Sequence, residues 1–179
     1  MSAIPTLTPS TAAAGPASPA APTTCDLCDA HKDDRLLRVL PPVFRSYGGR
    51  NRFAGRVRTV KCFEDNSSVK ALLEGPGQGQ VLVVDGAGSL RRALVGGNIA
   101  AAAARNGWAG VVVDGAVRDA VELAGCAVGL MALALMPMPT LRRQPGLVDV
   151  PVQVQGVWVQ PGDWLVADED GIVVSAGPL

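Results

Sequence analysis

The chain has 179 residues, and its 16 basic and 16 acidic side chains give a formal net charge of +0. A hydrophobic fraction of 48% against a charged fraction of 18% excludes a globally disordered protein. The balanced charge and an aromatic content of 4% argue against a direct nucleic-acid binder, which needs a basic surface and base-stacking side chains. The length predicts a single folded domain.

The first 23 residues are almost entirely Ala, Pro, Ser and Thr. Because such a segment cannot bury enough apolar surface to offset the entropy of ordering it, residues 1–23 are predicted to be a disordered tail and residues 24–179 the domain. The tail's prolines interrupt any apolar run, which argues against a secretory signal. The most apolar stretch, residues 123–138, is shorter than a membrane span. We therefore expect a cytoplasmic protein with reduced cysteines and no membrane partner.

The residue pattern in the first half of the domain predicts both helices and strands. Thr24 is suited to cap a helix over residues 25–33. The alternating pattern of residues 56–62 is typical of a half-buried strand, and a helix over residues 66–73 ends at Gly75.

The second half continues this order. The pattern predicts, in turn, a buried strand at 81–84, an Ala-rich helix at 98–105, a strand at 110–113, a helix at 118–123 and a strand at 130–135. Residues 150–175 alternate between apolar and polar side chains around glycine turns, which indicates antiparallel hairpins. The expected fold class is α/β, in a mixed α+β arrangement.

A glycine pair and two Asp-Gly steps mark the candidate site. Asp85-Gly86 and Asp114-Gly115 each follow a predicted buried strand, where ligands collect on open α/β sheets. Gly96-Gly97 directly precedes the Ala-rich helix, so its N–H groups would lie at the positive end of the helix dipole and could hold a small anion. A plain turn before a helix also explains this pair, and on pattern alone it is the commoner case.

Charged side chains follow the next strand. Adjacent residues on a helix do not face each other, so Arg118 and Asp119 are expected to contact different partners, such as a ligand oxyanion and a metal ion. Glu122 would share a helical face with Asp119, and two carboxylates at this spacing suit a hard divalent cation. The alternative is a capping Asp119 with a solvated Glu122.

Cysteine and histidine provide weaker motifs. Cys25-Asp-Leu-Cys28 is a lone CxxC with only His31 nearby, while Cys62 and Cys126 are distant in sequence. This falls short of the four ligands of a structural zinc site. Because His31 is the only histidine, a Ser-His-Asp triad is also not expected.

Four stretches resemble the RraA family, which contains regulators of ribonuclease E activity and 4-hydroxy-4-methyl-2-oxoglutarate aldolases. They are Phe53–Gly55 with Thr59–Asn66, Val81–Gly86, Arg91–Leu94 and Asp114–Asp119. The resemblance covers the chain from about Leu27 onwards. It implies a swivelling β/β/α-type domain, assembled as a homotrimer or a dimer of trimers.

The aldolases of that family carry a Gly, twenty residues, Arg-Asp, two residues and then Glu or Asp. Gly97, Arg118-Asp119 and Glu122 match this spacing completely. The resemblance implies that Arg118 binds substrate, that Asp119 is the ligand of a divalent metal (Mg²⁺ or Mn²⁺), and that Glu122 acts through metal-bound water. It also implies that a loop holds the pyruvyl carboxylate through its backbone, made of Gly96, Gly97, Asn98 and Ile99.

The expected function is therefore a metal-dependent class II aldolase that cleaves 4-hydroxy-4-methyl-2-oxoglutarate to pyruvate. Decarboxylation of oxaloacetate gives the same enolate, so we expect it as a second activity. A Schiff-base mechanism would need a lysine, and Lys32, Lys61 and Lys70 all lie outside the candidate cluster.

The alternative function is a protein-binding inhibitor of ribonuclease E, because the Thr59–Asn66 and Arg91–Leu94 stretches resemble regulator-type members. In either case a neighbouring subunit is expected to shield the site from water. The apolar residues 130–138, with Trp158 and Trp164, are expected to supply the interface of the homotrimer.

Overall fold

The computed structural model describes residues 22–179, so the predicted tail lies outside the described residues except for Pro22 and Thr23. Four helices lie in this part of the chain: α1 (Thr24–His31), α2 (Ser67–Leu73), α3 (Gly97–Arg105) and α4 (Ala120–Ala124). The strands are β1 (Arg38–Val39), β2 (Arg45–Ser46), β3 (Phe53–Lys61), β4 (Val81–Asp85), β5 (Ala93–Val95), β6 (Gly110–Val117), β7 (Gly129–Leu135), β8 (Leu147–Val148), β9 (Val152–Val154), β10 (Val157–Val159), β11 (Trp164–Ala167) and β12 (Ile172–Ser175).

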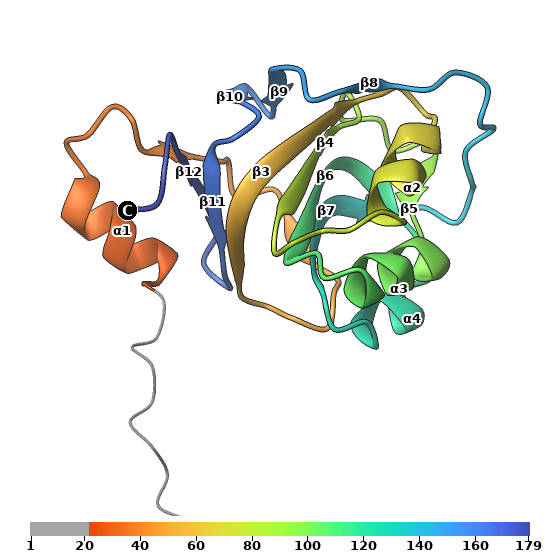
Figure 1. Ribbon diagram of the computed structural model, residues 1–179, viewed down its shortest axis with the longest axis horizontal. Helices are drawn as coiled ribbons and strands as arrows, with labels where there is room; N and C mark the ends of the chain where they lie inside the picture. Colours follow the sequence, from red (N-terminus) through yellow and green to blue (C-terminus); the bar gives the residue numbers. More distant parts are fainter. Residues whose placement is uncertain (1–21) are drawn as a thin grey trace, which may run out of the picture.

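A curled ten-stranded sheet forms the body of the molecule (Figure 1). Its strand order is β1-β12-β11-β3-β4-β6-β7-β2, with β5 paired to β6 and β8 paired to β3. Strands β3, β4, β6 and β7 run parallel, whereas β11 and β12 pair antiparallel with their neighbours. The mixed α/β fold class and the C-terminal hairpins are therefore confirmed.

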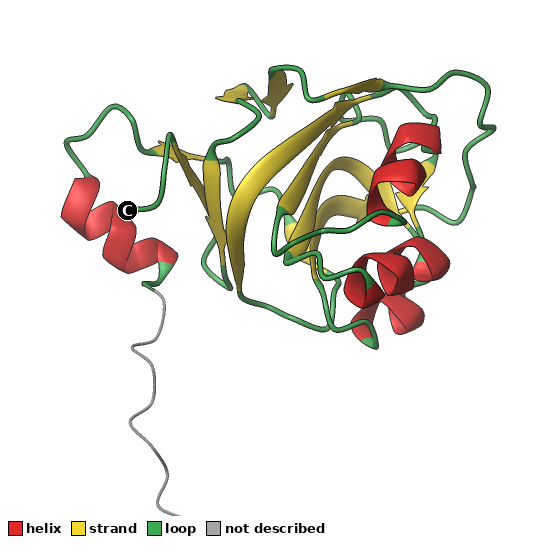
Figure 2. Ribbon diagram, in the orientation of Figure 1, coloured by secondary structure: helices red, strands yellow, loops and turns green. Residues whose placement is uncertain are grey.

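Two apolar layers stabilise this sheet, one on each face. Helices α2, α3 and α4 cover one face (Figure 2), and Val111 and Val113 of β6 point into that layer with Leu82 of β4. Val112 points the other way, into a second layer with Leu165 and the β9–β10 hairpin. Successive side chains of a strand alternate between faces, so strands buried on both sides must be almost wholly apolar. This explains the Val-rich runs of β4 and β6.

The predicted strand at residues 110–113 is too short. β6 continues through Asp114-Gly115 to Val117, because the pairing with β7 shifts register between Val113 and Ala116 and lets the strand pass the glycine. The extension also pairs with β5, a short strand that the sequence pattern does not indicate. Asp114 therefore lies inside a strand and not at its end.

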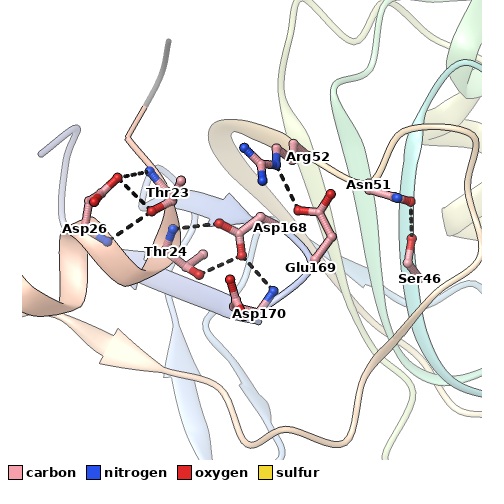
Figure 3. Close-up of polar contacts among 9 residues, drawn as sticks. All are labelled: Thr23, Thr24, Asp26, Ser46, Asn51, Arg52, Asp168, Glu169 and Asp170. Carbon is pink, nitrogen blue, oxygen red and sulfur yellow. Dashed lines mark hydrogen bonds and ion pairs between the residues drawn. The ribbon is translucent and has the colours of Figure 1, made fainter.

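The first helix begins one residue earlier than predicted. Thr23, not Thr24, is the N-cap residue of α1, and it forms a capping box with Asp26. Thr24 instead binds the C-terminal hairpin: its N–H and hydroxyl donate to the two carboxylate oxygens of Asp168 at 2.7 and 2.6 Å (Figure 3). These contacts dock α1 far from the other three helices, beside β11 and β12 (Figure 1).

No helix within residues 22–179 has both the length and the apolar character needed to cross a membrane.

Candidate active site

A cavity of about 230 Å³ opens where β5 and β6 end. Gly96, which follows β5, and Asn98 and Ile99 of the first turn of α3 contribute to its lining, and the loop after β6 contributes Arg118 and Asp119. The other wall is residues 136–146, which connect β7 to β8 and which we call the strap. Its lining residues, with Asn66 beside them, are Pro139, Thr140, Leu141 and Arg142.

The glycine pair is needed because two carboxylates lie against it. Gly96 is the N-cap residue of α3 and Gly97 its first residue. A Cβ added to Gly96 would lie 2.6 Å from Asp119 Oδ2, and one added to Gly97 would collide with the Glu122 carboxylate. The Gly97 N–H donates to Asp119 Oδ2 at 3.0 Å. The pair is therefore more than a turn, since any side chain would displace these two acids.

Asp119 has an unusual backbone conformation. It is the N-cap residue of α4 and lies in the left-handed region, with φ 64° and ψ 48°. Left-handed backbone is uncommon outside glycine and asparagine or aspartate, and it concentrates at functional sites. Helix α4 begins at Ala120, so Arg118 precedes the helix instead of opening it as predicted. The turn at Asp119 aims its carboxylate at the loop after β5.

Arg118 and Asp119 contact each other, contrary to the expectation from helical geometry. Arg118 Nε lies 3.5 Å from Asp119 Oδ2, because the two residues occupy a turn in which neighbouring side chains can converge. The Arg118 backbone N–H donates to Val95 O at 3.0 Å, which ties the loop to β5. Its side chain remains 39% exposed, so the guanidinium is accessible from the cavity.

The structure separates the remaining predicted acids. Glu122 does not line the cavity, although it contacts Gly97 from the helix side. Asp85 and Asp114 are paired neighbours on β4 and β6 and lie outside the cavity lining. Asp114 accepts a hydrogen bond from Gln155 Nε2 at 2.7 Å, on the sheet face opposite the helices. Burial raises the pKa of Asp114, and the nearby charge of Asp85 raises it further.

Among the cavity residues that the sequence did not predict are Asn66 and Arg142. Asn66 is 5% exposed and Arg142 lies on the strap, with a φ of 49°. Arg142 Nε donates to Asn66 Oδ1 at 3.1 Å across a separation of 76 residues. No local spacing connects two positions so far apart. An Asn directly before a helix signals only a cap, so its position in the sequence does not mark Asn66 as a cavity residue.

The comparison with known protein families decides what kind of domain this is. A family model described as RraA-like, Aldolase/RraA, matches residues 24–174. The chain belongs to the Aldolase/RraA family. This confirms the resemblance inferred from the four sequence stretches, and it covers nearly the whole domain.

Relatives of this Aldolase/RraA protein are close in sequence. One from Albidiferax ferrireducens is 64% identical over 163 residues, covering 86% of this chain and 94% of the relative. A second, from Burkholderia mallei, is 58% identical over 157 residues with the same coverage. Both carry the provisional name 4-hydroxy-4-methyl-2-oxoglutarate aldolase.

Solved structures share the fold. The RNA-processing inhibitor RraA from a Thermus species is 53% identical with a TM-score of 0.84, covering 88% of this chain and 94% of that one. A Geobacillus kaustophilus structure described as S-adenosylmethionine: 2-dimethylmenaquinone methyltransferase is 42% identical with a TM-score of 0.82, covering 88% and 96%. The family fold is therefore shown, and these names span more than one activity.

Possible metal ligands are few in this Aldolase/RraA domain. Residues 22–179 contain no cluster of three or more His, Cys, Asp or Glu side chains that could hold a metal ion. Cys25, Cys28, Cys62 and Cys126 are all free thiols, and the CxxC lies on α1, away from the cavity. Burial raises the pKa of the Cys62 thiol to about 12. Among the residues that line the cavity, Asp119 is the one carboxylate.

Proposed function

We propose that this protein is a 4-hydroxy-4-methyl-2-oxoglutarate aldolase with oxaloacetate decarboxylase activity. The observation that carries the proposal is the cavity in which Arg118, Asp119 and the Gly96–Ile99 loop converge. Of the residues implied by the aldolase motif, Arg118 and Asp119 line the cavity, and Gly97 and Glu122 contact each other beside it. The names of relatives at 64% and 58% identity support the same activity.

The reaction breaks the C3–C4 bond of the substrate. The C4 hydroxyl loses its proton and becomes the ketone of one pyruvate, while C1 to C3 leave as the enolate of a second pyruvate, which then takes up a proton at C3. Arg118 donates charge-assisted hydrogen bonds to the oxygens on which the negative charge develops. Decarboxylation of oxaloacetate produces the same enolate, so one cavity serves both reactions.

Binding of the substrate follows from the two sides of the cavity. The loop Gly96–Ile99 lies at the N-terminus of α3, where backbone N–H groups favour a carboxylate. Arg142 on the strap provides a second cation besides Arg118. The substrate carries two carboxylates, at C1 and C5, so one cation is available near each end. No lysine lines this cavity among the described residues, consistent with an enolate mechanism without a Schiff base.

A divalent cation fits the donor chemistry of Asp119. Its carboxylate side chain is 36% exposed, and only Oδ2 takes part in the contacts to Gly97 and Arg118. A hard cation such as Mg²⁺ or Mn²⁺ prefers oxygen ligands and retains several waters, so one carboxylate with Glu122 behind the glycine turn suits it. When bound, such an ion polarises the 2-oxo group and stabilises negative charge on its oxygen.

Pyruvate release from 4-hydroxy-4-methyl-2-oxoglutarate and from oxaloacetate tests the proposal. We expect turnover with Mg²⁺ or Mn²⁺, its loss in EDTA, and its recovery when metal is added. Asp119→Asn tests the ligand, because asparagine tolerates the left-handed backbone and keeps an oxygen for Gly97 while removing the charge. Full activity after exhaustive chelation would overturn the metal requirement. Failure to cleave either acid would overturn the aldolase proposal.

A homotrimer is the proposed assembly. Leu135, Met138 and Leu141 lie at or near the cavity with exposed fractions of 50%, 51% and 54%. Leu130, expected to contribute to an interface, is instead fully buried in the sheet. Exposed apolar residues beside a polar cavity favour cover by a neighbouring subunit. An active species with the 18.4 kDa mass of one chain in light scattering would contradict this assembly.

Inhibition of ribonuclease E is a second candidate, supported by the similarity to the RNA-processing inhibitor RraA. Such inhibition would use the outer surface and would not need the cavity. We therefore expect Arg118→Ala to abolish turnover and to leave any inhibition of the ribonuclease intact. Inhibition by the wild type without cleavage of any 2-oxo acid would favour the regulator.

A further inference from the structure

Asn66 occupies the N-cap position of α2 but does not cap the helix. Asparagine at this position normally accepts a hydrogen bond from a backbone N–H of the first turn. Here its side chain forms no such bond, and Asp65 Oδ1 accepts from Ser67 N at 2.8 Å instead. Because Asn66 is 5% exposed, its amide must find partners inside the protein.

Those partners lie on both sides of the cavity. Asn66 Nδ2 donates to the backbone oxygen of Leu94 at 2.9 Å, in the strand that leads to the glycine turn. Its Oδ1 accepts from the Thr140 hydroxyl at 2.8 Å and from Arg142 Nε at 3.1 Å, both on the strap. One buried amide therefore joins β5, the strand before the loop proposed to hold the 2-oxo acid end, to the strap that carries the second cation.

The preceding residue holds the strap's backbone. Asp65 Oδ2 accepts from the N–H groups of Arg143 and Gln144, the latter at 2.9 Å. Arg142 has a left-handed backbone, a strained conformation that persists only where surrounding contacts impose it. Asp65 fixes the main chain of the strap, and Asn66 fixes the direction of the Arg142 side chain.

The chemistry of the Asn66–Arg142 contact favours ligand binding. Arginine has five N–H donors, and the bond to Asn66 uses Nε, so the two terminal nitrogens remain for a bidentate contact with a carboxylate. The amide is neutral, so it orients the guanidinium and leaves its positive charge intact. An aspartate at position 66 would instead neutralise that charge.

We propose that Asn66 is a positioning residue that aims Arg142 at the distal carboxylate of a dicarboxylic 2-oxo acid. The inference rests on the proposed function of the cavity. It predicts a preference for dicarboxylic over monocarboxylic 2-oxo acids that depends on Asn66. Pyruvate, which lacks a distal carboxylate, is the natural comparison.

The test is a double-mutant cycle of Asn66→Ala and Arg142→Ala. KM and kcat are measured for oxaloacetate, and exchange of pyruvate methyl protons with D₂O is followed by NMR. Each single variant is expected to raise the KM for oxaloacetate about tenfold, the scale of one charge-assisted hydrogen bond, and to slow pyruvate exchange by a smaller factor. The double variant is expected to equal Arg142→Ala, because Asn66 acts through Arg142. Additive effects, or an equal loss of pyruvate exchange, would overturn the proposal.

Two further variants separate orientation from folding. Thr140→Val removes the other strap donor to Asn66 Oδ1 and leaves the Arg142–Asn66 bond in place, so its KM for oxaloacetate should rise less than that of Asn66→Ala. Asn66→Asp keeps an acceptor for the strap but neutralises the guanidinium, so it should raise the KM for oxaloacetate even if Asn66→Ala does not fold. A wild-type KM in Asn66→Asp would contradict the role of the free charge.

Failure of the aldolase proposal would be seen separately, as a wild type that neither exchanges pyruvate protons nor cleaves a 2-oxo acid. Titration calorimetry with glutarate, a non-reacting five-carbon dianion, makes the same comparison of variants without turnover. Asn66→Ala should weaken glutarate binding about tenfold, again the scale of one charge-assisted hydrogen bond. Unchanged affinity would overturn the positioning role.

Discussion

Two aspartates, Asp119 at the cavity and Asp168 at the base of α1, show how the same side chain serves different ends. Asp168 is 2% exposed and accepts hydrogen bonds from the N–H and hydroxyl of Thr24 and from Asp170 N at 3.0 Å (Figure 3). The Asp119 side chain is 36% exposed, and among the described residues it accepts a hydrogen bond only from Gly97 and forms an ion pair only with Arg118.

The difference lies in how many of the carboxylate's acceptor positions the protein itself fills. Asp168 is buried and accepts three hydrogen bonds from protein donors, so it contributes to stability and is not accessible to a ligand. Asp119 keeps an open oxygen beside a guanidinium, at the end of a strained turn, which is what a binding group needs. Changes near Asp119 should therefore alter activity at constant stability, and changes near Asp168 the reverse.

The largest expected effect is at the cavity. Arg118→Ala should lower kcat/KM for oxaloacetate by about 100-fold or more, the usual scale for removing a group that stabilises an oxyanion. Its free energy of unfolding should stay within about 0.5 kcal/mol of the wild type, because the side chain is partly exposed. Steady-state kinetics and urea unfolding measure the two quantities. A loss of unfolding free energy as large as the loss of transition-state stabilisation would contradict the distinction between the Asp119 and Asp168 regions.

The next largest effect is expected at Asp168, which holds α1 against the C-terminal hairpin. Asp168→Ala should lower the free energy of unfolding by about 2 kcal/mol, because it leaves the buried N–H and hydroxyl of Thr24 without a partner, while kcat/KM stays unchanged. The matched control is Glu169→Ala, which removes only an exposed ion pair with Arg52 and should cost less than about 1 kcal/mol. Equal losses of unfolding free energy in the two variants would contradict the role of Asp168 in docking α1.

A smaller effect is expected at the glycine turn. Gly97→Ala should reduce kcat/KM about tenfold, on the scale expected when a catalytic geometry is displaced without loss of its groups, because the new Cβ forces the Glu122 carboxylate away. Gly171→Ala is the control, since nothing lies within 4 Å of its added Cβ, and its activity and stability should be unchanged. A fully active Gly97→Ala would show that the position of Glu122 does not matter.

The smallest effect concerns acid stability. Burial raises the pKa of Asp168, but hydrogen bonds from Thr24, Asp170 and Gly171 outweigh it, so the pKa is lowered in the folded state. A lowered folded-state pKa gives stability that is present above the unfolded value of about 3.9 and is lost as the pH falls through the folded value. Thr24→Val removes one donor, so its free energy of unfolding should fall less between pH 7 and pH 3. An identical pH dependence in both proteins would contradict this linkage.

How far the sequence predicted the site depends on whether its residues share a local motif. The aldolase motif predicts Gly97, Arg118, Asp119 and Glu122 as site residues because it spaces them within 26 residues of one another. Even so, the contact between Arg118 and Asp119 was predicted wrongly, because spacing on a helix does not apply to a left-handed turn. Asp85 and Asp114 were grouped with the site, yet strand alternation turns Asp114 to the opposite face.

By itself the sequence determined the α/β class, the family and the strands buried on both faces, because these depend on hydrophobic periodicity and on residues close together in the chain. Only the tertiary structure decided that the strap folds over the cavity and brings Arg142 to Asn66. That contact joins residues 76 positions apart, and it depends on how β7 and β8 are placed in the sheet. Local propensity carries no information about such a pairing, since the energy that fixes it arises only when the whole sheet has formed.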